Sequence, residues 1–276
     1  MTERAKPNGI GRLREHALHA AVCEWCAQPG DAFEVDVEGY RIDVVRGEQL
    51  IEVQTGNFSG LRDKLARLLP EHPVTVVYPV ALVRWIVRLP VEAGAPVTRR
   101  RSPRKGRATD LFDELVRIAP LAAHPHLRLQ VVYTHEEELR RDDGRGSWRR
   151  KGVSIVDRRL LEVVDTRSFA TVDDYAALLP QDAGEFTSRD LARALAIRLP
   201  QARRMAYCLH ALGVLEQAGK RGRERLWLRA APYFTTFCCV PAANAAMLSI
   251  VVCSRRARAE RVAHEMCGVM WQLSSV

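Results

Sequence analysis

Alternation of apolar and polar residues predicts a small unit of helices and strands within the first 80 residues. Three short runs alternate with a period of two, as half-buried strands do, and segments of helical periodicity flank them. The predicted elements are a helix at 10–27, strands at 32–37, 41–45 and 50–54, a helix at 61–69 and a strand at 74–80. This order indicates an α/β fold.

The second and third predicted strands form a tight hairpin. They flank Arg46-Gly47-Glu48-Gln49, and a glycine near the centre of so short a connection is a hairpin signal. If Gly47 and Glu48 form the loop, Asp43 faces Glu52. Because side chains alternate between the two faces of a strand, one face holds Arg41, Asp43, Glu52 and Gln54, and the core-facing side holds Ile42, Val44, Ile51 and Val53.

The facing carboxylates of Asp43 and Glu52 are the first candidate site. Like charges directly opposite in a strand pair repel, and a cation between them removes that repulsion. Carboxylate oxygens suit Mg²⁺ or Mn²⁺, and a metal so held activates water and stabilises charge on a phosphodiester. The alternative is that both acids lie on a solvated sheet face, with Arg41 beside them as a screening partner.

The order of elements and this pair of acids resemble the PD-(D/E)XK superfamily of restriction-endonuclease-like nucleases, with its αβββαβ core. The resemblance covers roughly the first 80 residues. It implies that Asp43 is the Asp of the motif and that Glu52-Val53-Gln54 is the (D/E)XK triplet. It also implies that Glu15, on the leading helix, completes a metal site that hydrolyses DNA.

Gln54 stands where most members of this superfamily carry a lysine. The resemblance then gives Gln54 the role of orienting water. Lys64, on the following helix, is placed to reach back and stabilise charge at the site. The alternative puts Lys64 on the solvent side of its helix, beside a stripe formed by Leu61, Leu65 and Leu68.

Residues 171–230 resemble a winged helix-turn-helix domain. A first helix at 172–179 ends at Pro180, and a capping box at Thr187–Asp190 starts a second helix at 188–195. A third helix follows from Pro200, with its buried stripe at Ala202, Met205, Ala206, Leu209 and Leu212. Two runs, 214–217 and 224–228, then form a hairpin with a basic tip, the predicted wing.

The winged helix is predicted to bind DNA. Gln201, Arg203 and Arg204, on the outward side of the third helix, are the candidates for base edges, and Lys220, Arg221 and Arg223 are those for phosphates. The chain carries a formal charge of +9, and residues 186–276 hold 14 Lys and Arg against 5 Asp and Glu. Because residues 1–95 hold 11 against 13, the basic excess lies with the predicted binding part. The alternative is a winged helix used for protein contact.

Residues 96–170 are interpreted as an extension of the nuclease-like domain. A helix is predicted at 109–118, a strand at 127–133, and a strand or helix at 153–164. The basic, turn-rich segments 98–107 and 142–151 are predicted exposed loops that either contact phosphates or act as solvated linkers. Trp148, in the second of these, either stacks on a base or anchors its loop.

The seven cysteines, in a chain without a secretory leader, predict reduced thiols and a cytoplasmic protein. Cys23 and Cys26 form a single CxxC with His16 and His19 upstream, which favours packing residues over a zinc site. The tail 231–276 is apolar and holds four of the cysteines. Pro241 and Asn244 interrupt it, so no membrane span is expected.

The sequence therefore predicts a nuclease-like domain at 1–170, with its core at about 10–90, a winged helix-turn-helix at 171–230 and a tail at 231–276. The favoured function is metal-dependent hydrolysis of DNA, with Mg²⁺ or Mn²⁺ as cofactor. One alternative is a DNA-binding regulator whose nuclease-like domain is inactive, which the glutamine at position 54 supports. Another is a protein adaptor with neither activity. Restriction enzymes of this type often act as dimers, so a homodimer is one possible assembly.

Overall fold

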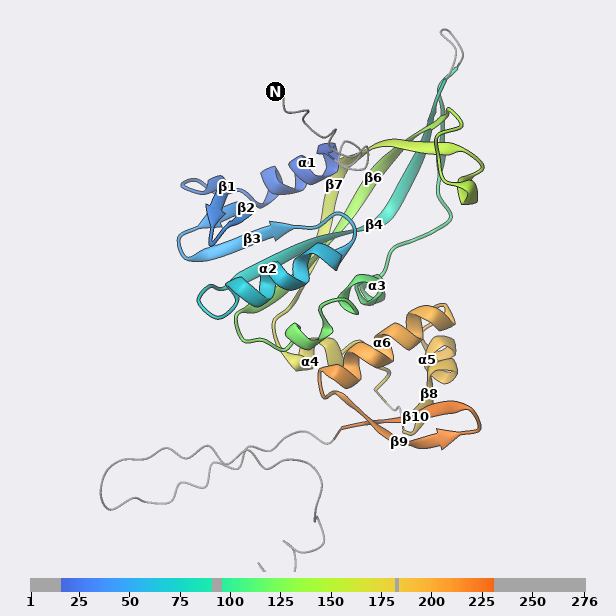
Figure 1. Cartoon of the computed structure of the whole chain (residues 1–276). Helices are drawn as coiled ribbons and strands as arrows, with labels where there is room; N and C mark the ends of the chain where they lie inside the picture. Colours follow the sequence, from blue (N-terminus) through green and yellow to red (C-terminus); the bar gives the residue numbers. More distant parts are fainter. Residues whose placement is uncertain (1–15, 91–95, 182–183, 231–276) are drawn as a thin grey trace, which may run out of the picture. The chain divides into compact units, whose positions relative to one another are not determined.

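The computed structural model describes residues 16–90, 96–181 and 184–230 (Figure 1). The chain divides into two units, Met1–Ala231 and Pro232–Val276, and all described residues belong to the first. Glu15, the start of the predicted first helix and the tail 231–276 lie outside the described residues. Within the described part, no helix is long and apolar enough to cross a membrane.

The predicted order of helix, three strands, helix and strand is confirmed. The elements are α1 (His16–Cys26), β1 (Ala32–Val37), β2 (Tyr40–Arg46), β3 (Gln49–Val53), α2 (Leu61–Leu68) and β4 (Val74–Leu89), with a 3-10 turn, Phe58–Gly60, before α2. The hairpin register is also confirmed, because Val45 pairs with Leu50 and Arg46 with Gln49. Gly47 has a φ of +56°, a conformation that L side chains rarely adopt, so the turn needs a glycine there.

These strands belong to a seven-stranded mixed sheet with the order β1-β2-β3-β4-β6-β7, in which β5 pairs with β4. The added strands are β5 (Thr98–Arg101), β6 (Leu127–Asp142) and β7 (Val153–Phe169). The first three strands run antiparallel, β4 is parallel to both β3 and β6, and β7 is antiparallel to β6. The fold is thus a mixed α/β structure around one large sheet.

Strands β4 and β6 each extend for 16 residues, well beyond the predicted strands at 74–80 and 127–133. The second half of β6 is mostly charged, and some of its acids pair with β4: Arg84 contacts Glu136 and Glu138 on the neighbouring strand. The second half of β4 stays largely apolar. The ambiguous segment 153–164 is a strand. The predicted loop at 98–107 is partly wrong, since Thr98–Arg101 forms the exposed edge strand β5.

Helices cover both faces of the sheet. On one face, Leu18 and Val22 of α1 pack on Val44, Ile51 and Val53. On the other, the leucines of α2 pack in a larger cluster that includes Ile42, Leu50 and Val76. Burial of these side chains supplies most of the free energy that holds the sheet and the helices together.

Strand β2 does not alternate regularly between the two faces. Ile42 lies in the α2-side core, whereas Val44 lies in the α1-side core. In the β1–β2 ladder, Phe33 pairs with Val44 and Val35 pairs with Ile42, but Glu34 and Asp43 between them do not pair. Glu34 also has a φ of +51°. The prediction that Ile42 shares a face with Val44, Ile51 and Val53 is therefore wrong, because this irregularity turns the strand at Asp43.

The chain after β7 folds into short helices and a three-stranded sheet. The elements are α4 (Val172–Ala176), β8 (Phe186–Thr187), α5 (Ser188–Ala194), α6 (Leu199–Ala211), β9 (Leu215–Arg221) and β10 (Glu224–Arg229), with the sheet order β8-β10-β9. The predicted capping box is confirmed: Thr187 Oγ1 accepts from Asp190 N, and Thr187 N donates to Asp190 Oδ2. The predicted apolar stripe of α6 is buried.

The segment between β5 and β6 links the two parts of this unit. The predicted helix at 109–118 is a succession of short turns, namely η2 (Ala108–Leu111), α3 (Phe112–Leu115) and η3 (Ala119–Leu121), and another short turn, η4 (Trp148–Arg150), precedes β7. Phe112 and Leu115 of α3 share one core cluster with Met205 and Leu209 of α6. The apolar core thus continues across residue 170, and the division of the chain there stays a prediction.

Candidate metal-binding and catalytic site

Asp43 lies where β2 separates from β3. The last ladder pair between these strands is Val44 with Ile51. Beyond it, the backbone N–H of Val53 donates to Asp43 Oδ2 at 2.8 Å. The Asp43 carboxylate therefore accepts the hydrogen bond that a backbone carbonyl of β2 would accept in a regular ladder. This bond holds Asp43 close to Glu52, the residue before Val53.

Glu52 is almost fully enclosed. It is 7 % exposed, and its Oε2 lies 2.5 Å from Lys64 Nζ on α2. Lys64 is 9 % exposed and also donates to the backbone oxygen of Arg41 at 2.6 Å. The alternative that placed Lys64 on the solvent side of its helix is wrong, because the buried face of α2 is wide enough to include it with the leucines.

Gln54 joins Glu52, since its Nε2 donates to Glu52 Oε1 at 3.3 Å. Gln54 and Lys64 thus both bond to Glu52, and Asp43 lies close enough for its charge to act on Glu52. The predicted direct pairing of Asp43 with Glu52 across the hairpin is wrong, because the ladder ends at Val44–Ile51. Glu15, the remaining predicted ligand, lies outside the described residues. The donor set available to a cation is two carboxylates and an amide, with an ammonium group beside them.

The electrostatics of Glu52 reflect the closeness of Asp43. Burial raises the pKa of Glu52 above its usual value, the charge of Asp43 raises it further, and Lys64 acts in the opposite direction. A buried carboxylate whose ionisation is opposed by a second carboxylate nearby suits a divalent cation, because the cation favours its charged form.

His19 and Cys23 of α1 also reach this site, and neither was predicted as a partner of Asp43. His19 Nε2 lies 3.2 Å from Asp43 Oδ2, and Cys23 Sγ lies 3.7 Å from His19 Nδ1. The hydrogen bond to Asp43 is the main cause that raises the pKa of His19 to about 10. The only sequence signal was the four-residue spacing of His19 and Cys23, which places them on one helix face.

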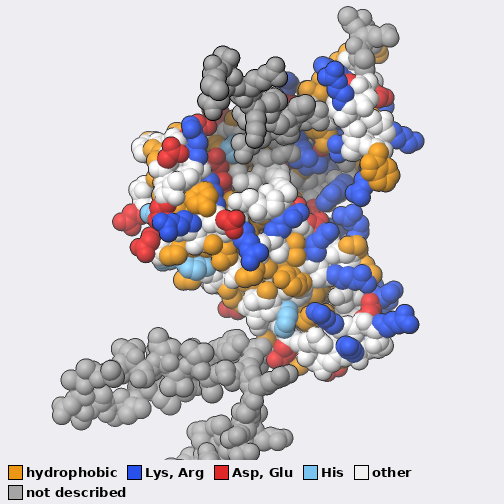
Figure 2. Space-filling model, in the orientation of Figure 1, with side chains coloured by type: hydrophobic (Ala, Val, Ile, Leu, Met, Phe, Trp, Pro, Cys, Tyr) orange, Lys and Arg blue, Asp and Glu red, His pale blue; other side chains and the backbone are white. Residues whose placement is uncertain are grey.

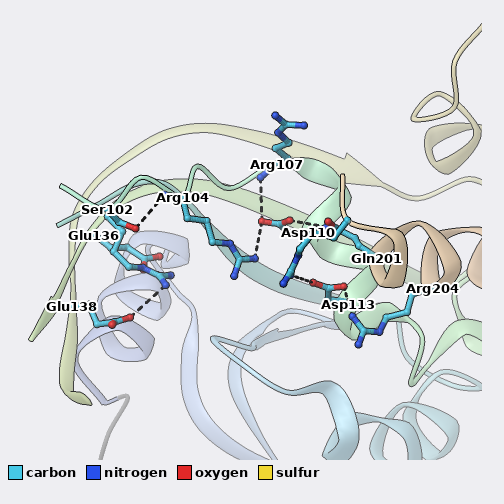
Figure 3. A network of polar contacts seen from close by, with 11 residues as sticks. Ser102, Arg104, Arg107, Asp110, Asp113, Glu136, Glu138, Gln201 and Arg204 are labelled. Carbon is cyan, nitrogen blue, oxygen red and sulfur yellow. Dashed lines mark hydrogen bonds and ion pairs between the residues drawn. The ribbon is translucent and has the colours of Figure 1, made fainter. Parts of the chain in front are cut away.

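A cavity of about 440 Å³ opens beside the site. Leu18, next to His19, and Thr55 and Gly56, directly after Gln54, form part of its wall. The opposite wall is charged and comes from the second halves of the long strands and from the segment before α3. In that wall the buried carboxylate of Glu136 faces Arg84, which also contacts the buried Glu138 behind it, and nearby Arg104 lies 3.4 Å from Asp110 (Figure 3).

Two of the predicted DNA-binding residues bond to side chains in the segment around α3. Gln201 is 5 % exposed and donates to Asp110 Oδ1 at 2.7 Å, and Arg204 Nη1 lies 2.7 Å from Asp113 Oδ1 (Figure 3). The prediction that Gln201 points outward is wrong, because this side of α6 packs on the segment around α3. Arg204 is exposed, as predicted, and pairs with Asp113 at the surface.

The other predicted contacts are accessible. Arg203, Lys220, Arg221 and Arg223 are exposed, although Arg221 also pairs with Asp190 at 3.1 Å. Arg203 and Arg223 line a cavity of about 340 Å³ between α6 and β10, together with Tyr207, Arg225 and Trp227. Figure 2 shows Lys and Arg side chains gathered over the part formed by α5, α6 and the β9–β10 hairpin.

Comparison with known proteins places this α/β chain in a family. Residues 16–170 match the family described as Domain of unknown function (DUF8091). The chain is also 36 % identical over 231 residues to an uncharacterized protein of Treponema pallidum (strain Nichols), a match covering 81 % of this chain and 88 % of that protein. The chain therefore belongs to the DUF8091 family, whose matched region contains Asp43, Glu52, Gln54 and Lys64 but not Glu15. No solved structure matches it.

Proposed function

We propose that this protein is a metal-dependent nuclease that resembles the PD-(D/E)XK superfamily and acts on DNA. The observation that carries the proposal is the closeness of Asp43 and Glu52 at the point where two strands separate, with Lys64 reaching Glu52 from the next helix. The order α1-β1-β2-β3-α2-β4, with helices on both faces of the sheet, supports it as well.

Each residue of the site has a definite role in this proposal. Asp43 and Glu52 hold Mg²⁺ or Mn²⁺, and Glu15 assists according to the resemblance. Such an ion, when bound, would activate water and stabilise the charge on a phosphodiester. Lys64 supplies the positive charge that the usual lysine of the motif would bring and that Gln54 lacks. The ammonium group of Lys64 already lies against Glu52. Gln54, fixed by its bond to Glu52, orients the attacking water.

The basic surface around α6 and the β9–β10 hairpin would hold the DNA. Its accessible cations, Arg203, Lys220 and Arg223, suit phosphate oxygens, and three helices followed by a hairpin resemble a winged helix. Gln201 drops out of the proposed contact set because it is buried and bonds to Asp110. Arg204 is exposed but already pairs with Asp113, as Arg221 does with Asp190.

A second function, that of a DNA-binding regulator without nuclease activity, is favoured by one observation. Both oxygens of Glu52 already have partners in Lys64 and Gln54, so a metal has to compete for this carboxylate. The basic surface would serve a regulator equally well. A nuclease would cut DNA, whereas the regulator would bind DNA without cutting it.

The test is incubation of the purified protein with plasmid, linear, branched and single-stranded DNA in Mg²⁺ or Mn²⁺. The variant Asp43→Asn/Glu52→Gln keeps the shape of both side chains while removing their charges. We expect its cleavage rate to fall by at least about 100-fold, as when one electrostatic group leaves an active site. Asp36→Asn/Glu48→Gln, which changes two exposed acids of the same strand region, is the matched control. Binding without cleavage in either metal would instead support the regulator.

A further inference from the structure

Three side chains beside the proposed nuclease centre form a second group of metal donors. They are His19 and Cys23 of α1 and Asp43 of β2, all half-buried. One ligand atom from each lies within 4.8 Å of the others. His19 and Cys23 are one helical turn apart, so both project from the face of α1 that meets Asp43.

The spacing of these atoms fits one small cation. Around a tetrahedral Zn²⁺, with Zn–S of about 2.3 Å and Zn–N of about 2.0 Å, neighbouring ligand atoms lie about 3.3–3.6 Å apart. In the structure Cys23 Sγ lies 4.0 Å from His19 Nε2, and His19 Nε2 lies 3.2 Å from Asp43 Oδ2. Because all three ligand atoms already lie within 4.8 Å of one another, small side-chain rotations would bring them into coordination.

The chemistry of the donors selects the metal. A thiolate and an imidazole are soft or borderline ligands that favour Zn²⁺, whereas Mg²⁺ prefers oxygen. Three protein ligands leave a fourth position for water, as in zinc sites that are not closed. Cys26 does not belong to this group, so the relevant partners of Cys23 are His19 and Asp43 and not the second cysteine of the CxxC.

We infer that His19, Cys23 and Asp43 bind one Zn²⁺ ion, and that this ion inhibits the protein by drawing Asp43 away from the Mg²⁺ position. The ion takes the place of the protons held on the thiol and imidazole, which pass to solvent. The binding part of this inference stands on the three donors alone. The inhibition part rests on the proposed nuclease function.

The test of binding uses Co²⁺ as a probe for the zinc position, because a cysteine ligand gives a sulfur-to-cobalt charge-transfer absorption band. Four further cysteines lie in the tail, so the full chain is used with Cys238, Cys239, Cys253 and Cys267 replaced by Ser. We expect one equivalent of Co²⁺ to produce the band and Zn²⁺ to abolish it. Cys23→Ser should remove the band, His19→Ala should weaken binding by at least about 100-fold, and Cys26→Ser should leave both unchanged.

Circular dichroism of each variant separates loss of a ligand from loss of folding. A folded Cys23→Ser variant that keeps the band, or a parent that shows none, would overturn the binding site.

Inhibition is measured as Mg²⁺-dependent DNA cleavage against rising Zn²⁺. We expect Cys23→Ser to need at least about tenfold more Zn²⁺ than the parent for the same inhibition, and equal sensitivity would overturn the inhibitory role. If no DNA is cut at all, the cobalt spectra still decide the binding site by themselves.

Discussion

Replacement of Lys64 by Met is expected to destabilise the protein strongly at neutral pH. The change keeps the length and apolar stem of the side chain but leaves Glu52, 7 % exposed, as a buried charge without its cation. Breaking a buried ion pair by removing one partner costs about 3–5 kcal/mol. For a unit of this size, that corresponds to a fall in Tm of roughly 10 °C.

The loss should shrink on acidification, because Glu52 can escape its unfavourable environment by taking up a proton. Without Lys64, burial and the charge of Asp43 both raise the pKa of Glu52 in the folded protein. A carboxyl whose folded pKa lies above its unfolded value stabilises the fold when protonated, and this stabilisation is lost as the pH rises through the folded pKa. The variant should therefore be closest to the parent below the ordinary glutamate pKa of about 4.3.

The assay is urea unfolding followed by circular dichroism at pH 7.5 and at pH 5. The matched control is Arg62→Met, which replaces an exposed cation of the same helix and should change the free energy of unfolding by less than about 0.5 kcal/mol. The double variant Lys64→Met/Glu52→Gln should recover part of the lost stability, because no buried charge remains. A Lys64→Met variant that behaves like Arg62→Met, or whose loss is the same at both pH values, would refute the reasoning.

Three further outcomes are expected. Gln201→Ala should destabilise the protein by about 1–3 kcal/mol in thermal unfolding, since it leaves the carboxylate of Asp110 short of a donor, and should leave DNA affinity per folded molecule unchanged; a selective loss of DNA binding would contradict the internal role. Arg203→Ala and Arg223→Ala should each lower DNA affinity across all sequences and reduce the slope of log affinity against log salt by about 1 in gel-shift titrations, without a change in Tm; an unchanged slope would exclude phosphate contact. Asp190→Ala should lower the free energy of unfolding by about 1 kcal/mol, because the capping box of α5 is lost. Hydrogen bonds from Thr187 lower the pKa of Asp190, so the stability difference between the parent and the variant should disappear as the pH falls through that lowered pKa. Unfolding curves recorded at a series of decreasing pH values would show this.

In the hairpin, the local sequence predicts the register of the strands but not the direction of every side chain. A glycine in a two-residue connection sets the register, so the pairing of Val45 with Leu50 follows from the turn alone. The register does not decide the direction of every side chain. Asp43 leaves the ladder at an irregularity opposite Glu34, and Ile42 turns to the other core as a result. That irregularity involves a third strand, which the hairpin sequence does not contain.

The site shows the same division. The nearness of Asp43 and Glu52 was visible in the strand pattern, although the two are not ladder partners, whereas the approach of His19 and Cys23 depends on which face of the sheet α1 covers. The position of Gln201 on α6 follows from helical spacing, but its burial does not. It is buried because the segment around α3, almost a hundred residues earlier in the chain, packs on this side of α6.

By itself, the sequence determined the elements whose signals are local: the meander and its turn, the capping box at Thr187 and Asp190, and the apolar stripe of α6. These depend on backbone preferences and on periodicity over a few residues. Only the tertiary structure decided that Lys64 is buried against Glu52, that His19 reaches Asp43 and that the long strands continue through paired charges. These outcomes depend on the burial and pairing of groups far apart in the chain, which no local pattern encodes.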